Sequence, residues 1–361
     1  MKSILHSVAD DNDIVIEKME VMPDRVHVLI SCPPSKVPSS AIKALKGRNA
    51  FIFLKRHPEI KQSQYWGGHL WSPSYYMSTL GNMKGGVGKT TNSVMTAYQL
   101  ARQGYKTLVC DLDPQANATQ LLSRTYGLQN SKELKINKTM MVALTEENIP
   151  SAITQIMDNL YLLSSSEDFK NYPDYLEMKY MLDKGNVDIS NSRSLQAEMD
   201  RIKELRISYF TKQLAKVNAD YDFIILDVPP TLSIFTDSAI YTNDGIIIVL
   251  QKQQRSLDGA ETFFEYLQQM YNDYAEINFD ILGVLAVLLK NNAGLDNQII
   301  KDAEEDFGKD MLFDQVIRLK RYDRTGIAEK NLIKYDMHDS RFHYIYNQLT
   351  SEIVERIKEN Q

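Results

Sequence analysis

The stretch Lys84-Gly85-Gly86-Val87-Gly88-Lys89-Thr90-Thr91 decides how this sequence is interpreted. It departs from the common phosphate-loop pattern Gly-x-x-x-x-Gly-Lys-[Ser/Thr], because Met83 stands at the first glycine position and a second lysine, Lys84, follows it. Closely spaced glycines allow successive backbone N–H groups to turn inward around an anion, and a helix that starts directly after them presents its positive dipole end. The stretch therefore predicts a loop that binds the phosphates of a nucleotide.

The segments on either side of this stretch fit that interpretation. Residues 75–80 read as a strand, and residues 92–103 read as a helix that ends at Gly104. In such a loop the Lys89 ammonium faces the β- and γ-phosphates, and the Thr90 hydroxyl is a ligand for Mg²⁺. The predicted nucleotide-binding residues are Gly85, Gly86, Val87, Gly88, Lys89, Thr90 and Thr91.

Two apolar runs end in carboxylates. Residues 106–113 end in Asp111 and Asp113, and residues 221–227 end in Asp227. Apolar runs of this length, separated by helical patterns, predict buried parallel strands, and ligands of such sheets bind at the carboxyl ends of the strands. The expected fold class is therefore α/β, a P-loop NTPase with a mostly parallel sheet flanked by helices.

From about residue 77 to the C-terminus, the chain resembles the ParA family of DNA-partition ATPases, within the larger group that includes MinD. Four blocks in the family's order carry this resemblance: 84–91, 111–119 (Asp-Leu-Asp-Pro-Gln-Ala-Asn-Ala-Thr), 221–232 (Tyr-Asp-Phe-Ile-Ile-Leu-Asp-Val-Pro-Pro-Thr-Leu) and 246–250 (Ile-Ile-Ile-Val-Leu).

The resemblance implies roles for individual residues. Lys84 is similar to the signature lysine that reaches the partner's phosphates in a nucleotide-sandwich homodimer, and Asp111 to the residue that orients the attacking water. Asp227 is similar to the aspartate that holds Mg²⁺ through its water shell, and Asn291 to the residue that contacts the base. ATP and Mg²⁺ are the implied cofactors, and a ParB-like centromere-binding protein is the implied partner that stimulates hydrolysis.

A basic cluster follows a strand-like segment at residues 313–317. In ParA-like proteins the equivalent region contacts DNA without sequence preference, which requires only positive charge on one face. The family's proline near Ile317 is absent here, and a solvated helix face is the alternative interpretation. The predicted DNA-binding residues are Arg318, Lys320, Arg321 and Arg324.

Residues 1–76 resemble a different family, the small single-tyrosine transposases of insertion sequences. Residues 22–34 and 66–76 carry this resemblance, but Arg25 stands where the family has the first histidine of a metal pair, so that only His27 remains. The family's nucleophilic tyrosine lies beyond the point where the phosphate-loop domain begins. We therefore expect a truncated, incomplete α+β segment over 1–76 without strand-cleaving activity, followed by an ATPase domain over 77–361.

Composition sets the remaining expectations. The chain has 361 residues, 43% of them hydrophobic, a net charge of −6 and two cysteines that form no zinc or disulfide pattern. No apolar run approaches 18 residues and no signal peptide opens the chain, so a cytoplasmic protein without a membrane partner is expected. The resemblance to the ParA family implies that it is associated with the nucleoid. An apolar stripe from Phe342 to Ile357 predicts a C-terminal helix packed on the sheet. A MinD-like, membrane-associated positioning ATPase and a non-functional fusion relic remain the alternatives.

Overall fold

The computed structural model describes residues 2–10, 12, 14–21, 26–31, 75–81, 88–181, 192–251, 255–274, 276–288, 300–301, 303–318, 327 and 337–360. The chain divides into two compact units. One comprises Met1–Pro73 together with Val354–Gln361, and the other comprises Ser74–Ile353.

The N-terminal unit contains a helix and an antiparallel strand pair. Helix α1 (Lys2–Asp10) buries Leu5, Val8 and Ala9. Strands β1 (Val15–Val21) and β2 (Val26–Ser31) pair in antiparallel register, with His27 opposite Glu20. These elements are the described part of the α+β segment that the sequence predicts.

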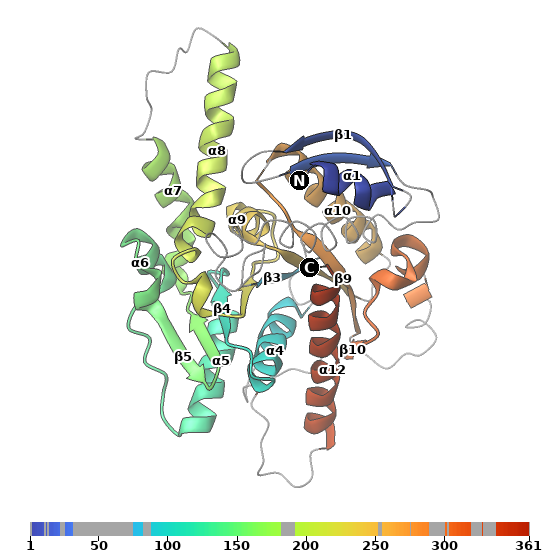
Figure 1. Ribbon diagram of the computed structural model, residues 1–361. Coiled ribbons are helices and arrows are strands. Elements are labelled where there is room, and N and C mark those ends of the chain that lie inside the picture. The colour runs from blue at the N-terminus through green and yellow to red at the C-terminus, as the bar shows by residue number, and fades with distance from the viewer. Residues whose placement is uncertain are drawn as a thin grey trace. The chain divides into compact units, whose positions relative to one another are not determined.

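An eight-stranded sheet forms the centre of the second unit (Figure 1). Its strand order is β10-β9-β8-β3-β7-β4-β6-β5, and every neighbouring pair is parallel except β5–β6. The strands are β3 (Tyr75–Gly81), β4 (Thr107–Asp111), β5 (Ile153–Met157), β6 (Leu160–Leu163), β7 (Phe223–Asp227), β8 (Gly245–Gln251), β9 (Asp280–Leu288) and β10 (Ile317–Arg318). The mostly parallel sheet predicted from the apolar runs is confirmed.

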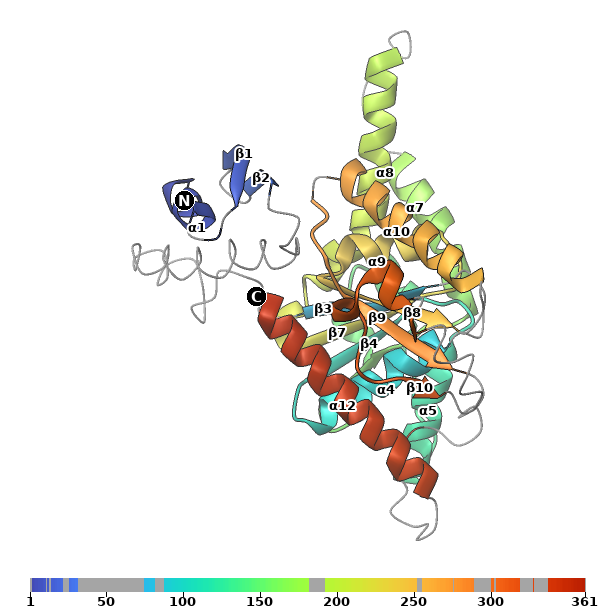
Figure 2. The ribbon, with the colours of Figure 1, turned by 90° about the vertical axis from the view of Figure 1, so that its right-hand side faces the viewer.

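Helices cover both faces of this sheet (Figure 2). Helices α4 and α5 lie on one face, together with α12, and helices α7 to α10 lie on the other. The helices are α4 (Lys89–Arg102), α5 (Asn117–Asn130), α6 (Met140–Thr145), α7 (Tyr172–Met181), α8 (Ser192–Leu214), α9 (Ile234–Thr242), α10 (Arg255–Asp273) and α12 (Met337–Asn360), and the short 3₁₀ turns are Ile149–Ala152, Glu167–Asn171, Asn218–Asp220 and Lys309–Met311. Burial on both faces explains why β7 is apolar up to its terminal aspartate and why β4 is apolar from Leu108 to Cys110.

The edge of the sheet differs from the sequence-based prediction. A strand is expected over 313–317, but β10 contains only Ile317 and Arg318. The amide of Phe313 donates to the Val284 carbonyl at 3.0 Å, whereas the next amide, Asp314, turns to the Glu352 carboxylate at 3.2–3.3 Å. The Glu352 side chain of α12 therefore accepts a hydrogen bond from a main-chain amide that a longer strand would need for pairing.

The C-terminal apolar stripe is buried. Phe342, Tyr346, Leu349, Ile353 and Ile357 are all less than 9% exposed, as the helical spacing predicts, whereas Ile345 of the same stripe is partly exposed. Polar groups also join α12 to α4: the Tyr346 hydroxyl donates to Asn92 Oδ1, and Gln99 Nε2 lies 2.9 Å from His343 Nδ1. The helix that the sequence places on the sheet thus packs alongside the helix that follows the phosphate loop.

Candidate nucleotide-binding site

Gly88 is the last glycine of the phosphate-loop stretch and is the N-cap residue of α4. Its φ of 84° lies in the left-handed region, which glycine adopts at little cost and other residues do not. The Asn92 amide donates to the Gly88 carbonyl at 2.9 Å, so the helix begins directly at this glycine. Strand β3 precedes the stretch and α4 begins within it at Lys89, which is the order of strand and helix expected around a phosphate loop.

Lys89 is the first residue of α4 and is only 6% exposed. Burial lowers the pKa of its ammonium group, because the charged form loses its hydration, while the nearby carboxylates of Asp227 and Asp113 act in the opposite direction. A lysine at the first turn of this helix is placed to face an anion bound at the helix N-terminus.

Asp227 is the last residue of β7 and is fully buried. Burial raises the pKa of its carboxyl group, and the hydroxyls of Thr90 and Ser93 oppose this rise by favouring the charged form. Ser93 Oγ donates to Oδ1 at 3.1 Å, whereas no hydrogen-bond donor within the described part of the chain reaches Oδ2. The second oxygen therefore retains the capacity to bind a ligand.

Asp111 ends the neighbouring strand β4 and lies opposite Asp227 in the parallel register. Its Oδ2 accepts hydrogen bonds from the Thr119 amide and hydroxyl, both at 2.8 Å, and its Oδ1 accepts one from the Asp113 amide at 3.2 Å. Burial raises the pKa of this carboxyl group, and the charge of Asp227 raises it further. The two aspartates come from strands more than 100 residues apart, and the sheet brings them to one edge.

The structure also adds three residues to the predicted site. Asp113 is 7% exposed and acts electrostatically on both Lys89 and Asp227. Ser93 and Thr119 hold the two buried aspartates. Asp113 and Thr119 lie within the second block of the family resemblance, so the sequence could have pointed to them as site residues. Nothing in the local sequence around Ser93 predicts its hydrogen bond to Asp227.

Several predicted residues lie outside the described part of the chain. These are Lys84, Gly85, Gly86, Val87 and Asn291 of the predicted nucleotide site, and Lys320, Arg321 and Arg324 of the predicted DNA-binding cluster. Arg318 is the last residue of β10. The described structure places Gly88, Lys89 and Thr90 at the start of α4. It places Asp111 and Asp227 at the ends of the neighbouring strands β4 and β7. Thr91 follows Thr90 in the first turn of α4.

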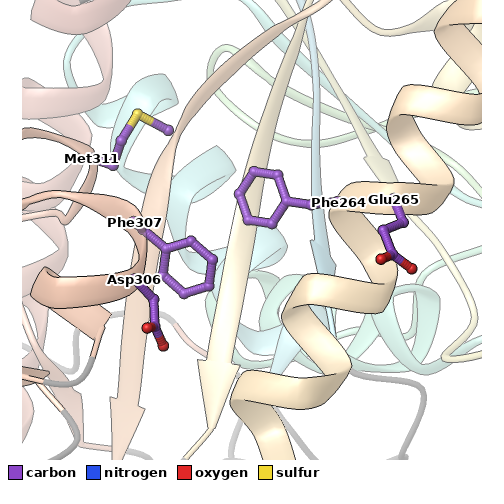
Figure 3. Close-up of a pocket in the computed structure, with 5 residues that line it drawn as sticks. All are labelled: Phe264, Glu265, Asp306, Phe307 and Met311. Carbon is purple, nitrogen blue, oxygen red and sulfur yellow. The ribbon is translucent and has the colours of Figure 1, made fainter. Parts of the chain in front are cut away.

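A separate cavity lies between α10 and the segment before β10 (Figure 3). Phe264 and Phe307 face one another there, with ring centroids 5.2 Å apart and ring planes at 23°. The other lining residues are Glu265, Asp306 and Met311. Among the residues that the structure describes, none of the predicted site residues lines this cavity, so it is distinct from the edge of the sheet where the aspartates meet.

No helix in the described ranges is long and apolar enough to cross a membrane.

Comparisons with known proteins agree with both parts of the sequence analysis. An AAA domain family model matches residues 77–281, and a "Transposase IS200 like" model matches residues 1–89. The sporulation initiation inhibitor protein Soj of Bacillus subtilis is 26% identical over 276 residues, which is 76% of this chain and 96% of that protein. A putative replication protein A of Rhizobium rhizogenes is 26% identical over 71% of this chain, which spans only 60% of that longer protein.

The front of the chain has its own relative. The ISDra2 transposase TnpA of Deinococcus radiodurans is 41% identical over 80 residues, which is 22% of this chain and 56% of the transposase.

Solved structures show the same fold at low sequence identity. Cobyrinic acid a,c-diamide synthase of Mycobacterium smegmatis, with bound ADP and magnesium, superimposes with a TM-score of 0.57 at 19% identity, over 80% of this chain and 97% of that one. A Cyanothece McdA variant in complex with ATP gives a TM-score of 0.58 at 17% identity, over 79% and 98% of the two chains. With a family model matching more than half of its length and Soj among its relatives, this chain belongs to the AAA domain family of ParA- and Soj-like proteins and carries an IS200-transposase-like segment at its front.

Proposed function

We propose that this chain is an ATP-dependent DNA-partition switch of the ParA type. It binds ATP and Mg²⁺, forms a homodimer on ATP, binds DNA without sequence preference, and hydrolyses ATP when a ParB-like partner stimulates it. The observation that carries this proposal is the convergence of Lys89, Asp111 and Asp227 at the carboxyl edge of the sheet, directly beside the N-terminus of α4. The nucleoid, in the cytoplasm, is the proposed place of action.

The donor set fits a magnesium ion held together with nucleotide phosphates. Asp227 has a carboxylate oxygen without a donor in the described structure, and the Thr90 hydroxyl lies near the same carboxylate. No group of three or more His, Cys, Asp or Glu side chains among the described residues is arranged to hold a metal by itself. Mg²⁺ typically takes one or two protein ligands and completes its shell with phosphate and water, and it neutralises phosphate charge.

The chain's own residues bind and orient the nucleotide in this proposal. Gly88 begins α4 and directs its positive end toward the phosphates. Lys89 supplies a positive charge. Because this side chain is buried, water screens its charge less, and its attraction to the phosphates is stronger than that of a surface lysine. Thr90 and Asp227 hold the metal side of the site.

Two carboxylates are candidates for orienting the attacking water. The family resemblance assigns this role to Asp111, and within the described part of the chain its Oδ1 accepts one hydrogen bond, from the Asp113 amide at 3.2 Å. Asp113 is the second candidate, because its Oδ1 accepts the Gln115 amide at 2.9 Å and its charge acts on Lys89. Separate alanine variants of the two residues decide between them: the residue that orients water is the one whose loss stops hydrolysis while ATP binding persists.

Lys84 is proposed to contact the partner subunit's phosphates, as the resemblance implies. A lysine supplied across a dimer couples dimer formation to hydrolysis in the same way as an arginine finger. ATP then acts as a dimerisation switch, because both subunits contact its γ-phosphate.

The nucleotide site is tested by measuring ATP–Mg²⁺ binding and hydrolysis by the full chain. Lys89→Ala abolishes binding, Lys84→Ala binds ATP but fails to dimerise in size-exclusion chromatography, and Lys212→Ala, an exposed lysine on α8, behaves as the parent. The phosphate-loop assignment is wrong if Lys89→Ala binds ATP as tightly as the parent does. A Lys84→Ala variant that forms the ATP dimer normally contradicts the role of Lys84.

DNA binding is tested by filter binding with ATP at several salt concentrations. The parent binds DNA of any sequence only with ATP, and its affinity falls steeply with salt because counterion release supplies most of the free energy. The double variant Arg318→Glu, Arg321→Glu loses DNA binding and keeps ATP binding. A parent that binds anionic vesicles instead of DNA supports the MinD-like alternative, and a parent that binds neither supports the relic alternative.

A further inference from the structure

Ser93 connects the helix that follows the phosphate loop to the aspartate at the end of β7. Its hydroxyl donates a hydrogen bond to Asp227 Oδ1 at 3.1 Å, and both residues have an exposed fraction of 0%. The two residues are 134 positions apart in the sequence, so the packing of α4 against β7 brings them together. The carboxylate is therefore held by a helix that begins at the nucleotide site.

A second hydroxyl of the same helix acts on this carboxylate. Thr90 and Ser93 are neighbours on the surface of α4, because residues three positions apart lie on the same side of a helix. Both hydroxyls interact with the carboxyl group of Asp227. One side of α4 thus offers two hydroxyl donors to the aspartate at the end of β7.

The two hydroxyls have different tasks once nucleotide and metal bind. The phosphate-loop motif makes Thr90 a ligand for Mg²⁺, so its oxygen turns to the metal. Ser93 lies about one helical turn further along α4, outside the motif. Of these two hydroxyls, that of Ser93 is therefore the one that can stay on the carboxylate while the metal is bound.

Charges around Asp227 do not fix its orientation well. Asp113, which is 7% exposed, repels the carboxylate, whereas Lys89 attracts it. Coulomb forces change little when a carboxylate rotates by a small angle, but a hydrogen bond is directional. The bond from Ser93 holds one carboxylate oxygen, and the other accepts no hydrogen bond within the described part of the chain. That second oxygen is left for the metal or one of its waters.

We propose that Ser93 is a positioning residue for Mg²⁺, which holds the Asp227 carboxylate in the orientation that binds the metal or one of its water ligands. This inference rests on the proposed function and refines it. Groups that hydrogen-bond to the ligands of a metal orient these ligands, and their loss typically lowers metal affinity by about 10- to 100-fold. The alternative is a purely structural role, in which the hydroxyl satisfies a buried carboxylate and contributes to stability alone.

The test measures how tightly the full chain binds a fluorescent, non-hydrolysable ATP analogue at increasing Mg²⁺ concentration and, separately, in EDTA. Ser93→Ala removes the hydroxyl, and Ser208→Ala is the matched control. Ser208 is also a buried helical serine, but its hydroxyl donates to the Leu205 carbonyl of its own helix, α8. Binding in EDTA reports the phosphate loop without the metal, whereas the Mg²⁺ titration reports the metal site.

The metal dependence should change in Ser93→Ala alone. We expect its half-saturating Mg²⁺ concentration to rise at least about tenfold, with the dissociation constant in EDTA within about threefold of the parent's. Ser208→Ala keeps both of the parent's values, although both variants lose a buried hydroxyl and are expected to unfold at a lower temperature than the parent. If Ser93→Ala does not fold by circular dichroism, Ser93→Cys takes its place, because a thiol is a weaker donor of similar shape.

The outcomes separate this inference from the proposed function. Equal Mg²⁺ dependence in folded Ser93→Ala and the parent overturns the positioning role and leaves the proposed function intact. A loss of affinity in EDTA as large as the loss with Mg²⁺ also overturns it, because the defect then lies in the phosphate loop and α4. A parent that binds the analogue equally well with Mg²⁺ and with EDTA overturns the metal site of the proposed function and this inference with it.

Discussion

Ala116 adopts a backbone conformation that normally belongs to glycine. Its φ of 54° and ψ of 37° place it in the left-handed region, at the turn that leads from Asp113 into α5. This conformation costs an L-residue about 1 kcal/mol relative to glycine. Ala116→Gly should therefore raise the free energy of unfolding by about 1 kcal/mol, measured by urea denaturation without nucleotide. Ala118→Gly, at a helical position two residues later, should lower it by a similar amount, and stabilisation by both changes would contradict the explanation.

The buried aspartates make the nucleotide-free protein sensitive to pH. Burial raises the pKa of Asp227 and Asp111 above the ordinary carboxyl range, so between that range and the raised values the folded state binds more protons than the unfolded state. Stability therefore falls as pH rises from 5 to 8. Asp227→Asn removes one titrating group and one charge beside Asp111, so its loss of stability over this window should be smaller. Urea denaturation at the two pH values measures the difference, and an unchanged pH dependence would contradict the prediction.

At the scale of elements, a polar contact joins the C-terminal helix to the helix that starts at the phosphate loop. The Tyr346 hydroxyl on α12 donates to Asn92 Oδ1 on α4, and both residues are fully buried. Tyr346→Phe leaves that oxygen without its donor and should cost about 1–3 kcal/mol of stability. Tyr344→Phe, on the same helix but 64% exposed, should change stability by less than about 0.5 kcal/mol. Thermal denaturation of the two variants compares them directly, and equal effects would show that the buried contact is not stabilising.

At the scale of the whole molecule, the domain boundary expected between residues 76 and 77 falls inside the central strand β3. Tyr75 and Tyr76 pair with Phe223 and Ile224 of β7, and Met77 is 1% exposed. A chain that starts at Ser74 should therefore keep ATP binding and a cooperative thermal transition. A chain that starts at Ser78 loses the first three residues of this strand and should be strongly destabilised or insoluble. Equal stability of the two shortened chains would mean that these residues are not needed in the sheet.

The amino-acid sequence by itself determined the fold class and the elements around the phosphate loop. The strand predicted at 75–80 became β3, the apolar runs ending in Asp111 and Asp227 became β4 and β7, and the helix after Gly88 became α4. These predictions succeed because hydrophobic period, glycine conformation and strand length are local properties of the chain. Family resemblance added the roles of Lys84, Asp111 and Asp227, which stay predictions.

Only the tertiary structure decided which side chains share the site. Asp111 and Asp227 meet because β4 and β7 are adjacent in the sheet, and Ser165 directs the Thr119 hydroxyl because β6 lies on the other side of β4. The short β10 likewise follows from a carboxylate on α12 that takes the Asp314 amide. Strand order and helix packing depend on the burial of residues far apart in the sequence and on the pairing of main-chain groups. The spacing of neighbouring residues therefore does not predict strand order or helix packing.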